Sequence, residues 1–94
     1  MNFTVEVTRR AAQDAERLGA WLMERDPRAA ARLGDLLERA IASLATHPLR
    51  GRQVDESVRE MSVPFGRSAY IIRYDVLDQQ VLITRIWHGL EERS

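Results

Sequence analysis

Apolar and polar positions alternate at the start of the chain. Phe3, Val5 and Val7 are separated by polar residues, and this period of two predicts a β-strand over residues 3–7 with one buried face. Thr8 comes next, and a threonine hydroxyl at this position can accept from a free backbone N–H of a following helical turn. The pattern therefore predicts a strand that leads directly into a helix.

Between Arg9 and Arg25 the apolar period lengthens to three or four residues, which predicts an amphipathic helix. Asp26-Pro27 ends this helix, because proline disfavours helical backbone in the residue before it. The same dipeptide suits the start of another helix, with Asp26 as N-cap and Pro27 in the first turn. The apolar stripe consists of Ala11, Ala15, Leu18 and Leu22, widened by Trp21 and Met23.

A second amphipathic helix is predicted over residues 27–46. Two such helices with almost no loop between them form an antiparallel hairpin. A hairpin alone buries neither stripe fully, so we expect it to pack against another surface. The second stripe consists of Ala30, Leu33, Leu37, Ile41 and Leu44.

Three strands are predicted in the second half of the chain, over residues 58–63, 68–76 and 80–88, after an irregular loop at 47–57. Short turns connect these strands, so neighbours are expected to be antiparallel. In the middle strand, one face carries Tyr70, Ile72 and Tyr74, and the other carries Ala69, Ile71 and Arg73. In the last strand, strict alternation puts Leu82, Thr84, Ile86 and His88 on one face and Val81, Ile83, Arg85 and Trp87 on the other.

The order strand, helix, helix, strand, strand, strand predicts an α+β fold. Helices that are grouped together pack on one face of an antiparallel sheet. The whole chain, residues 1–94, is expected to form a single domain, because its length fits one small core. The pattern does not predict where the first strand joins the sheet.

Composition narrows the function classes. Fourteen arginines balance fourteen acidic residues and lysine is absent, whereas a strongly basic nucleic-acid binder would show an excess of positive charge. The chain has no cysteine and two widely separated histidines, so we expect neither a disulfide nor a metal site, and no cofactor. The start of the chain does not resemble a signal peptide, and no apolar run approaches the roughly 20 residues that span a membrane. We therefore expect a cytoplasmic protein without a membrane partner.

Several motifs, in this order and spacing, resemble the RelE/ParE toxin superfamily over nearly the whole chain. The second helix begins with Pro27-Arg28-Ala29-Ala30, and Leu44-Ala45-Thr46-His47-Pro48 and Gly51-Arg52 follow it. The later strands carry Val58-Arg59-Glu60-Met61, Tyr70-Ile71-Ile72-Arg73-Tyr74 and Val81-Leu82-Ile83-Thr84-Arg85-Ile86-Trp87-His88-Gly89. The resemblance implies the toxin of a type II toxin–antitoxin pair, neutralised by a cognate antitoxin.

The same resemblance implies two modes of poisoning. RelE-like toxins cut mRNA on the ribosome, and ParE-like toxins inhibit DNA gyrase. The ending Arg85-Ile86-Trp87-His88-Gly89 is more similar to the ParE branch. A gyrase inhibitor is therefore the first hypothesis, a ribosome-dependent endoribonuclease the second, and a non-toxic antitoxin-binding module the third.

If the chain were a nuclease, His88 would be the candidate acid or base, and Arg59, Arg73 and Arg85 the candidate phosphate clamps. Glu60 and Tyr70 are possible additional partners. Each residue also has an ordinary structural interpretation, namely a backbone hydrogen bond for His88 and surface ion pairs or packing for the arginines. The missing lysines and the acidic Glu91 and Glu92 weigh against binding phosphate.

For the antitoxin, the sequence predicts a contact region near the strand ends. Phe65, Trp87 and Leu90 are expected to remain partly exposed, with Arg73 and Arg85 beside them as clamps for carboxylates. Arginine and aromatic residues are the types most enriched in binding hot spots. A disordered acidic antitoxin tail is expected to fold onto this region as a strand or a helix.

Overall fold

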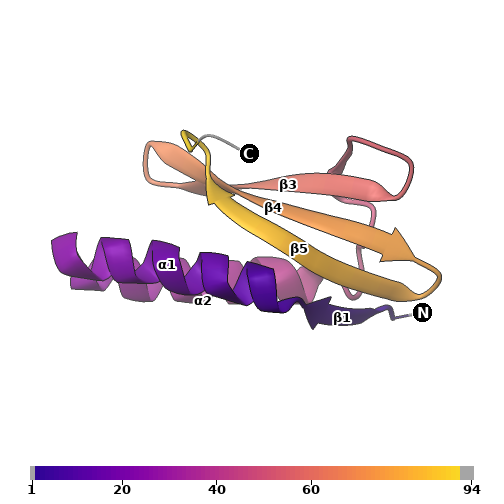
Figure 1. Cartoon of the computed structure of the whole chain (residues 1–94), viewed down its shortest axis with the longest axis horizontal. Coiled ribbons are helices and arrows are strands. Elements are labelled where there is room, and N and C mark those ends of the chain that lie inside the picture. The colour runs from indigo at the N-terminus through magenta and orange to yellow at the C-terminus, as the bar shows by residue number, and fades with distance from the viewer. Residues whose placement is uncertain (1, 92–94) are drawn as a thin grey trace.

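The structure, a computed structural model, describes residues 2–91. It has the predicted α+β architecture, with the helical hairpin on one face of the sheet (Figure 1). The elements are β1 (Thr4–Val7), α1 (Arg9–Arg25), α2 (Pro27–Ser43), β2 (Arg52–Gln53), β3 (Val58–Phe65), β4 (Ser68–Leu77) and β5 (Gln80–His88).

The sheet has the order β1-β5-β4-β3-β2. The prediction of an antiparallel sheet holds for every pair except the one that contains β1. The first strand pairs in parallel with β5, whereas the other pairs are antiparallel. A parallel neighbour needs a long connection, and the elements between β1 and β5 supply it. Phe3 and Val5 pack against the core, but Val7 is exposed, so only part of the predicted apolar face of β1 is buried.

Both predicted N-caps are present. The hydroxyl of Thr8 accepts from the N–H of Ala11 at 3.2 Å and donates to the carbonyl of Ile83 at 2.8 Å. The carboxylate of Asp26 accepts from the N–H of Ala29 at 3.1 Å. These caps satisfy amides that have no partner inside a helix. Thr8 also ties the start of α1 to β5.

Several element boundaries differ from the sequence prediction, and those of β1 and β4 differ by one residue. Helix α2 ends at Ser43 rather than near residue 46, and residues 44–46 form a turn. Strand β3 continues through Pro64 to Phe65. Proline is tolerated there because β2 pairs only with residues 59–60, so the outer edge of β3 at Pro64 needs no ladder hydrogen bond. Strand β2 lies in the segment that was predicted as a loop. A strand of two residues is too short to show an alternation of apolar and polar positions.

The core lies between the helices and one face of the sheet. Leu18, Leu33, Leu37 and Leu44 are buried against the inner face that Tyr70, Ile72 and Tyr74 form, as predicted. Leu22 and Ile41 are partly buried beside them. Trp21 and Met23 do not belong to this core, because their side chains are 56% and 54% exposed. They lie on the far half of α1, where the hairpin extends past the sheet (Figure 1).

A β-bulge changes the predicted faces of β5. Arg73 pairs with Arg85 and Tyr74 pairs with Ile83, so Thr84 is the extra residue opposite no partner. Val81 and Ile83 before the bulge and Ile86 after it are therefore all buried on the inner face. Strict alternation, which separated Ile83 from Ile86, was wrong at this position.

Candidate functional site

A row of charged side chains crosses the sheet face that the helices leave uncovered. Arg52 of β2 lies opposite Glu60 of β3, Glu60 opposite Arg73 of β4, and Arg73 opposite Arg85 of β5. Glu60 accepts from the Nε of Arg73 at 2.9 Å and lies 3.7 Å from the guanidinium of Arg52. Cross-strand neighbours share a face, so the row is a property of the register. Two of the predicted clamps, Arg73 and Arg85, are brought together there.

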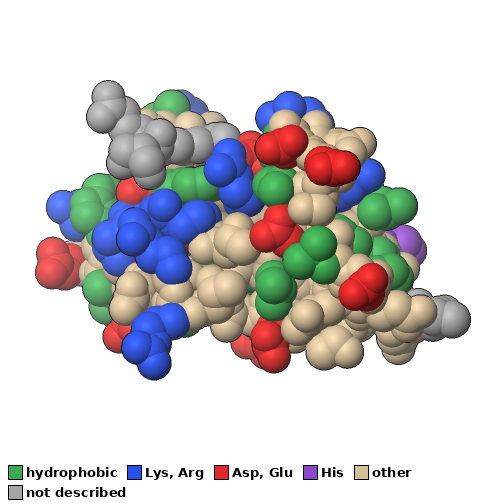
Figure 2. All heavy atoms as spheres, turned by 45° about the vertical axis from the view of Figure 1, so that its right-hand side comes forward, with side chains coloured by type: hydrophobic (Ala, Val, Ile, Leu, Met, Phe, Trp, Pro, Cys, Tyr) green, Lys and Arg blue, Asp and Glu red, His purple; other side chains and the backbone are tan. Residues whose placement is uncertain are grey.

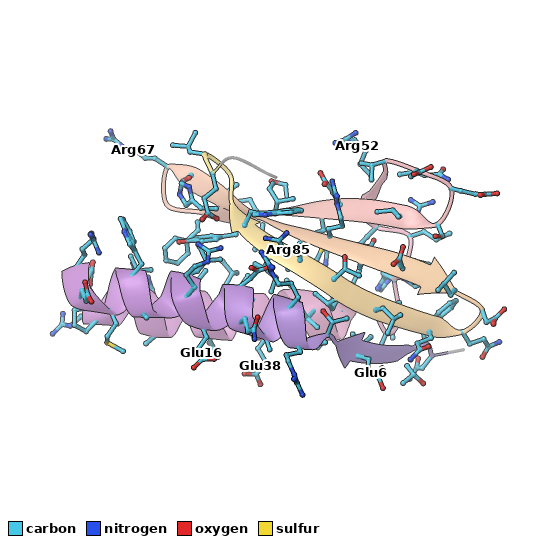
Figure 3. All side chains as sticks on the ribbon, viewed as in Figure 1. Glu6, Glu16, Glu38, Arg52, Arg67 and Arg85 are labelled. Atoms are coloured by element: carbon cyan, nitrogen blue, oxygen red, sulfur yellow. The ribbon has the colours of Figure 1, made fainter. Side chains whose placement is uncertain are left out.

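Asp14 of α1 completes this row at the edge of β5. Its carboxylate accepts from the Nε of Arg85 at 2.8 Å and from the backbone N–H of Ile86 at 2.9 Å. Figure 3 shows Arg85 between β5 and α1. Burial raises the pKa of Asp14, but the hydrogen bonds from Arg85 and Ile86 and the charges of Arg85 and Arg10 outweigh it, so the pKa lies below its usual value. Asp14 is therefore a carboxylate that holds the helix to the sheet.

Trp87 lies beneath two arginines on the same open face. The guanidinium of Arg73 is 5.0 Å from the centre of the indole ring, and that of Arg85 is 4.8 Å from it. Such contacts are cation–π interactions. Trp87 is only 3% exposed, so the expectation of a partly exposed Trp87 was wrong. Trp87 is instead a packed residue of the open face.

His88 lies on the inner face with both ring nitrogens engaged. Its Nδ1 accepts from the backbone N–H of Leu90 at 3.1 Å, and its Nε2 is 2.8 Å from the hydroxyl of Ser68. A backbone N–H can only donate, so Nδ1 carries no proton and Nε2 donates to Ser68. The ring of Tyr70 meets that of His88 edge-on, with 5.2 Å between centres. This geometry fixes the imidazole as a structural link.

Only some of the nuclease candidates come together, because Glu60, Arg73 and Arg85 share the open face whereas Arg59 and His88 lie on the inner one. Arg59 donates to the carbonyls of Leu49 and Gly51, at 3.1 and 2.7 Å, and points to the inner face beside Tyr74. Arg73 and Arg85 lie on the opposite face, whereas His88 is on the inner one. Burial raises the pKa of Tyr70, and the charge of Glu91 adds to this, so its phenol stays protonated. The candidate acid or base His88 is therefore separated by the sheet from the candidate clamps Arg73 and Arg85, and Glu92 lies outside the described residues.

A groove of about 600 Å³ opens between the far half of α1 and the ends of β3, β4 and β5. We call it the distal groove. Its apolar walls are Leu18, Trp21 and Leu22 of α1, Phe65 and Tyr70 of the β3–β4 hairpin, and Leu90. The five residues predicted to bind a partner thus fall on two surfaces. Phe65 and Leu90 line the distal groove, and Arg73, Arg85 and Trp87 lie on the open face.

An ion pair closes one side of the distal groove. Arg17 of α1 pairs with Glu91, whose carboxylate also accepts from the N–H of His88 at 2.7 Å. Burial raises the pKa of Glu91, but the hydrogen bonds from Arg17 and from the N–H of His88 outweigh this effect. The pKa therefore lies below its usual value. The chain after β5 is therefore held against α1, which places Leu90 at the groove.

Sequence reasoning missed Asp14, Trp21 and Ser68 as site residues. Asp14 lies outside the apolar stripe of α1, and a single aspartate on an amphipathic helix does not by itself indicate a site. Figure 2 shows basic side chains gathered on one part of the visible surface, with acidic ones mostly elsewhere. Net charge alone does not reveal such a separation.

Within residues 2–91, no helix is both long and apolar enough to cross a membrane. In the same range, no group of three or more acidic or histidine side chains is arranged to hold a metal ion.

Comparison with known families gives a match over most of the chain. The family described as "ParE toxin of type II toxin-antitoxin system, parDE" matches residues 5–93. The protein named Toxin RelE1 of Caulobacter vibrioides is 61% identical over 93 residues, covering 99% of this chain and all of that protein. Toxin RelE3 of the same organism is 40% identical and covers 96% and 98% of the two chains.

Solved structures agree in fold. A chain from "Chromosomal ParDE TA system from P. aeruginosa" has a TM-score of 0.73 and 19% identity, with 92% of this chain and 95% of that chain covered. A chain from the toxin–antitoxin complex RelBE2 of Mycobacterium tuberculosis has a TM-score of 0.60 and 26% identity, with 94% and 99% covered. This chain therefore belongs to the ParE toxin family of type II toxin–antitoxin systems, and the predicted superfamily is confirmed.

Proposed function

We propose that this toxin acts in the cytoplasm by binding and inhibiting DNA gyrase, without catalysing a reaction, and that a cognate antitoxin neutralises it. The observation that carries the proposal is the state of His88. Its Nδ1 accepts a backbone N–H and its Nε2 is bonded to Ser68, so neither nitrogen is free to move a proton on an RNA substrate. The loss of His88 as a candidate acid or base favours a toxin that acts by binding.

The arginines support the same conclusion. Arg73 is paired with Glu60 and Arg85 with Asp14. A phosphate that approaches these guanidiniums must compete with carboxylates already in place, and both carboxylates are buried. Stabilising a transferring phosphoryl group requires cations directed at it. Two arginines that are already paired with carboxylates contribute little to this stabilisation.

The second candidate is a ribosome-dependent endoribonuclease. Its specific support is the adjacent pair Arg73 and Arg85 on the uncovered face, where a nucleic acid has access to the sheet. The names RelE1 and RelE3 belong to the relatives and do not decide between the two targets. The third candidate, an antitoxin-binding module without toxicity, differs from both in having no effect on either target.

One experiment separates the three. Purified toxin is added to a DNA supercoiling reaction with gyrase and, separately, to translating ribosomes whose mRNA ends are mapped. We expect loss of supercoiling and intact mRNA, and recovery of supercoiling when antitoxin is added first. If mRNA cuts appear instead, persist in His47→Ala and vanish in His88→Ala, the chain is a nuclease. No effect in either reaction identifies the non-toxic module.

A further inference from the structure

We propose that arginines on the open face of the sheet and on the first half of α1 form a cationic row that contacts the phosphodiester backbone of the DNA held by gyrase. The cationic row consists of Arg52 of β2, Arg73 of β4, Arg85 of β5, and Arg10 and Arg17 of α1. The inference rests on the proposed function in taking the DNA to be that of the gyrase complex. The affinity of the row for a DNA duplex alone does not depend on that target.

The first support is a local excess of positive charge in a chain whose net charge is zero. The five arginines of the cationic row share three carboxylates, those of Asp14, Glu60 and Glu91. Five positive and three negative charges leave an excess of two. Asp75, two residues further along β4 than Arg73, bounds the row and accepts from the hydroxyl of Ser57. The row therefore attracts an anion although the chain as a whole does not.

The second support is the depth at which the two signs of charge lie. The side chains of Asp14 and Glu60 are only 3% and 5% exposed. Those of Arg10 and Arg52, which approach them at 3.6 and 3.7 Å, are 63% and 74% exposed. A guanidinium has five N–H donors, so each of these arginines also presents donors to solvent. A phosphate can thus bind from outside while the buried carboxylates stay in place, which is sufficient for holding a backbone without reaction.

The third support is the scarcity of exposed apolar surface along the cationic row. Trp87, beneath Arg73 and Arg85, is 3% exposed. The large apolar side chains that residues 2–91 expose are Val7, Trp21, Met23, Leu49, Leu77 and Leu90, and in the sheet none of them lies opposite a residue of the row. Protein partners depend on apolar and aromatic anchors, whereas interfaces with DNA are more polar and more positively charged. DNA therefore fits this surface better than a protein does.

The length of the cationic row suits a phosphate backbone. Arg52 and Arg85 lie on β2 and β5, which are separated by β3 and β4. Neighbouring strands are about 4.8 Å apart, so this part of the row spans roughly 14 Å. Arg10 and Arg17 continue the row over α1, beyond the edge of β5. Successive phosphates of one DNA strand advance about 3.4 Å along the helix axis, so the row reaches several of them.

Acidic side chains of the helices are directed away from this surface. Figure 3 shows Glu16 and Glu38 on the side of the hairpin that faces away from the sheet, whereas Arg52 and Arg85 lie on the side of the sheet. Both glutamates are exposed. A polyanion that follows the cationic row does not meet their carboxylates.

An excess of two charges predicts weak binding to DNA alone. Nonspecific complexes that depend on phosphate contacts have Kd values on the order of 10⁻⁴ to 10⁻⁶ M and weaken steeply with salt. On gyrase the DNA is already held beside the toxin, so the row meets it at a high effective concentration. We therefore expect the toxin to bind the gyrase–DNA complex more tightly than gyrase alone.

The row is tested with the double variant Arg10→Gln/Arg52→Gln. It leaves each buried carboxylate with its closer guanidinium, from Arg85 or Arg73, so the fold should be retained. The measurement is the Kd for a short DNA duplex by fluorescence anisotropy at several salt concentrations, together with thermal unfolding. For the parent we expect log K to fall with log salt at a slope of about −2, since two phosphates are neutralised. The double variant should bind at least about fivefold more weakly at low salt, with a slope near zero.

The matched control is Arg28→Gln/Arg39→Gln, which removes the same charge from two exposed positions of α2. It should change the Kd for the duplex by less than about twofold and keep the slope of the parent, because these arginines do not contact the backbone. Equal losses in the row variant and the control would overturn the proposal, since the effect would then follow from net charge alone.

The second measurement is the Kd of each variant for gyrase with and without bound DNA. The parent and the control should prefer the gyrase–DNA complex severalfold, whereas the row variant should bind both forms equally and keep the affinity for gyrase alone. A parent that does not bind gyrase would refute the proposed function and the gyrase part of this inference. Binding of the duplex that depends on Arg10 and Arg52 would still identify the row as a DNA-binding surface.

Two further outcomes overturn the inference. If the parent binds no duplex at low salt and shows no preference for the gyrase–DNA complex, the row consists of internal ion pairs only. If it binds a single-stranded RNA of the same length more tightly than the duplex, the surface belongs to RNA and the endoribonuclease is favoured.

Discussion

Arg85 and Asp14 are 71 positions apart in the sequence, and the Nε of Arg85 donates to the Oδ2 of Asp14 at 2.8 Å. The contact joins α1 to the last strand at the point where β1 no longer covers the edge of β5. It also explains why Arg85, predicted as a clamp for a partner's carboxylate, already has a carboxylate within its own chain.

Removing Arg85 should destabilise the fold. Arg85→Ala leaves the carboxylate of Asp14, which is 3% exposed, without its closest cation. We expect a loss of about 3 kcal/mol, at the low end for a broken buried pair, because Arg10 and Arg17 also lie within 4 Å of Asp14. Chemical denaturation measures this loss.

The control is Arg39→Ala, whose ion pair with Asp35 is exposed on both sides. It should stay within about 0.5 kcal/mol of the parent. Equal effects in the two variants would show that the contact between Arg85 and Asp14 contributes no more than a surface pair.

The expected loss of stability also affects tests of partner binding. Because Arg73 and Arg85 both pair with buried carboxylates, an alanine at either position does not test partner binding cleanly. Contact of the antitoxin with these residues and Trp87 stays a prediction.

The Asp14 carboxylate should also make stability depend on pH. Its folded pKa lies below the ordinary value of 3.8, so its contribution is present above pH 3.8 and is lost as pH falls through the folded pKa. We expect the difference in unfolding free energy between the parent and Asp14→Asn to shrink as pH is lowered below about 4. The control is Asp35→Asn, which removes an exposed carboxylate from α2. A constant difference for Asp14→Asn would contradict the ionised pair.

His88 should be found as the tautomer with its proton on Nε2. The N–H of Leu90 donates to Nδ1 at 3.1 Å, which leaves Nε2 to donate to Ser68. Nitrogen-15 NMR of the imidazole at neutral pH distinguishes the two tautomers directly, and His47 serves as the reference residue. A proton on Nδ1 of His88 would reopen its assignment as an acid or base.

Leu37 on α2 tests the predicted helix phase. It is 5% exposed in the core between the hairpin and the sheet, so Leu37→Ala should cost about 2–5 kcal/mol through lost burial and the cavity left behind. Leu49→Ala, at an exposed leucine, should change stability by less than about 0.5 kcal/mol. Comparable losses at both positions, measured by denaturant unfolding, would mean that Leu37 is not packed as the structure has it.

Gly51 should not tolerate a side chain. A Cβ there would lie 2.6 Å from the hydroxyl of Tyr74 and 3.0 Å from the carbonyl oxygen of Glu60. The Gly51 N–H also donates to the Tyr74 hydroxyl at 2.8 Å, so Gly51→Ala should strain this contact and lower the unfolding temperature. Gly34→Ala, in the middle of α2 with open space around it, should raise stability by up to about 1 kcal/mol. We therefore expect the change in unfolding free energy to have opposite signs in Gly51→Ala and Gly34→Ala.

The sequence by itself determined the element order and most of the core. Local signals were sufficient where one residue interacts with its near neighbours, as in the caps Thr8 and Asp26 or the apolar stripe around Leu33 and Leu37. The periods of two and of three to four residues are local properties of strands and helices, so they can be read from one chain without its partners.

Tertiary structure alone decided how the candidate site residues are grouped. The bulge at Thr84 shifted the faces of β5, and the register placed Arg73 beside Arg85 but Arg59 on the other side of the sheet. The distal groove lies between the far half of α1 and the strand ends, and Trp21 is exposed there although its position fits the helix stripe. The physical reason is that pairing register and helix placement depend on contacts between distant parts of the chain, such as Asp14 with Arg85, and no local period encodes those contacts.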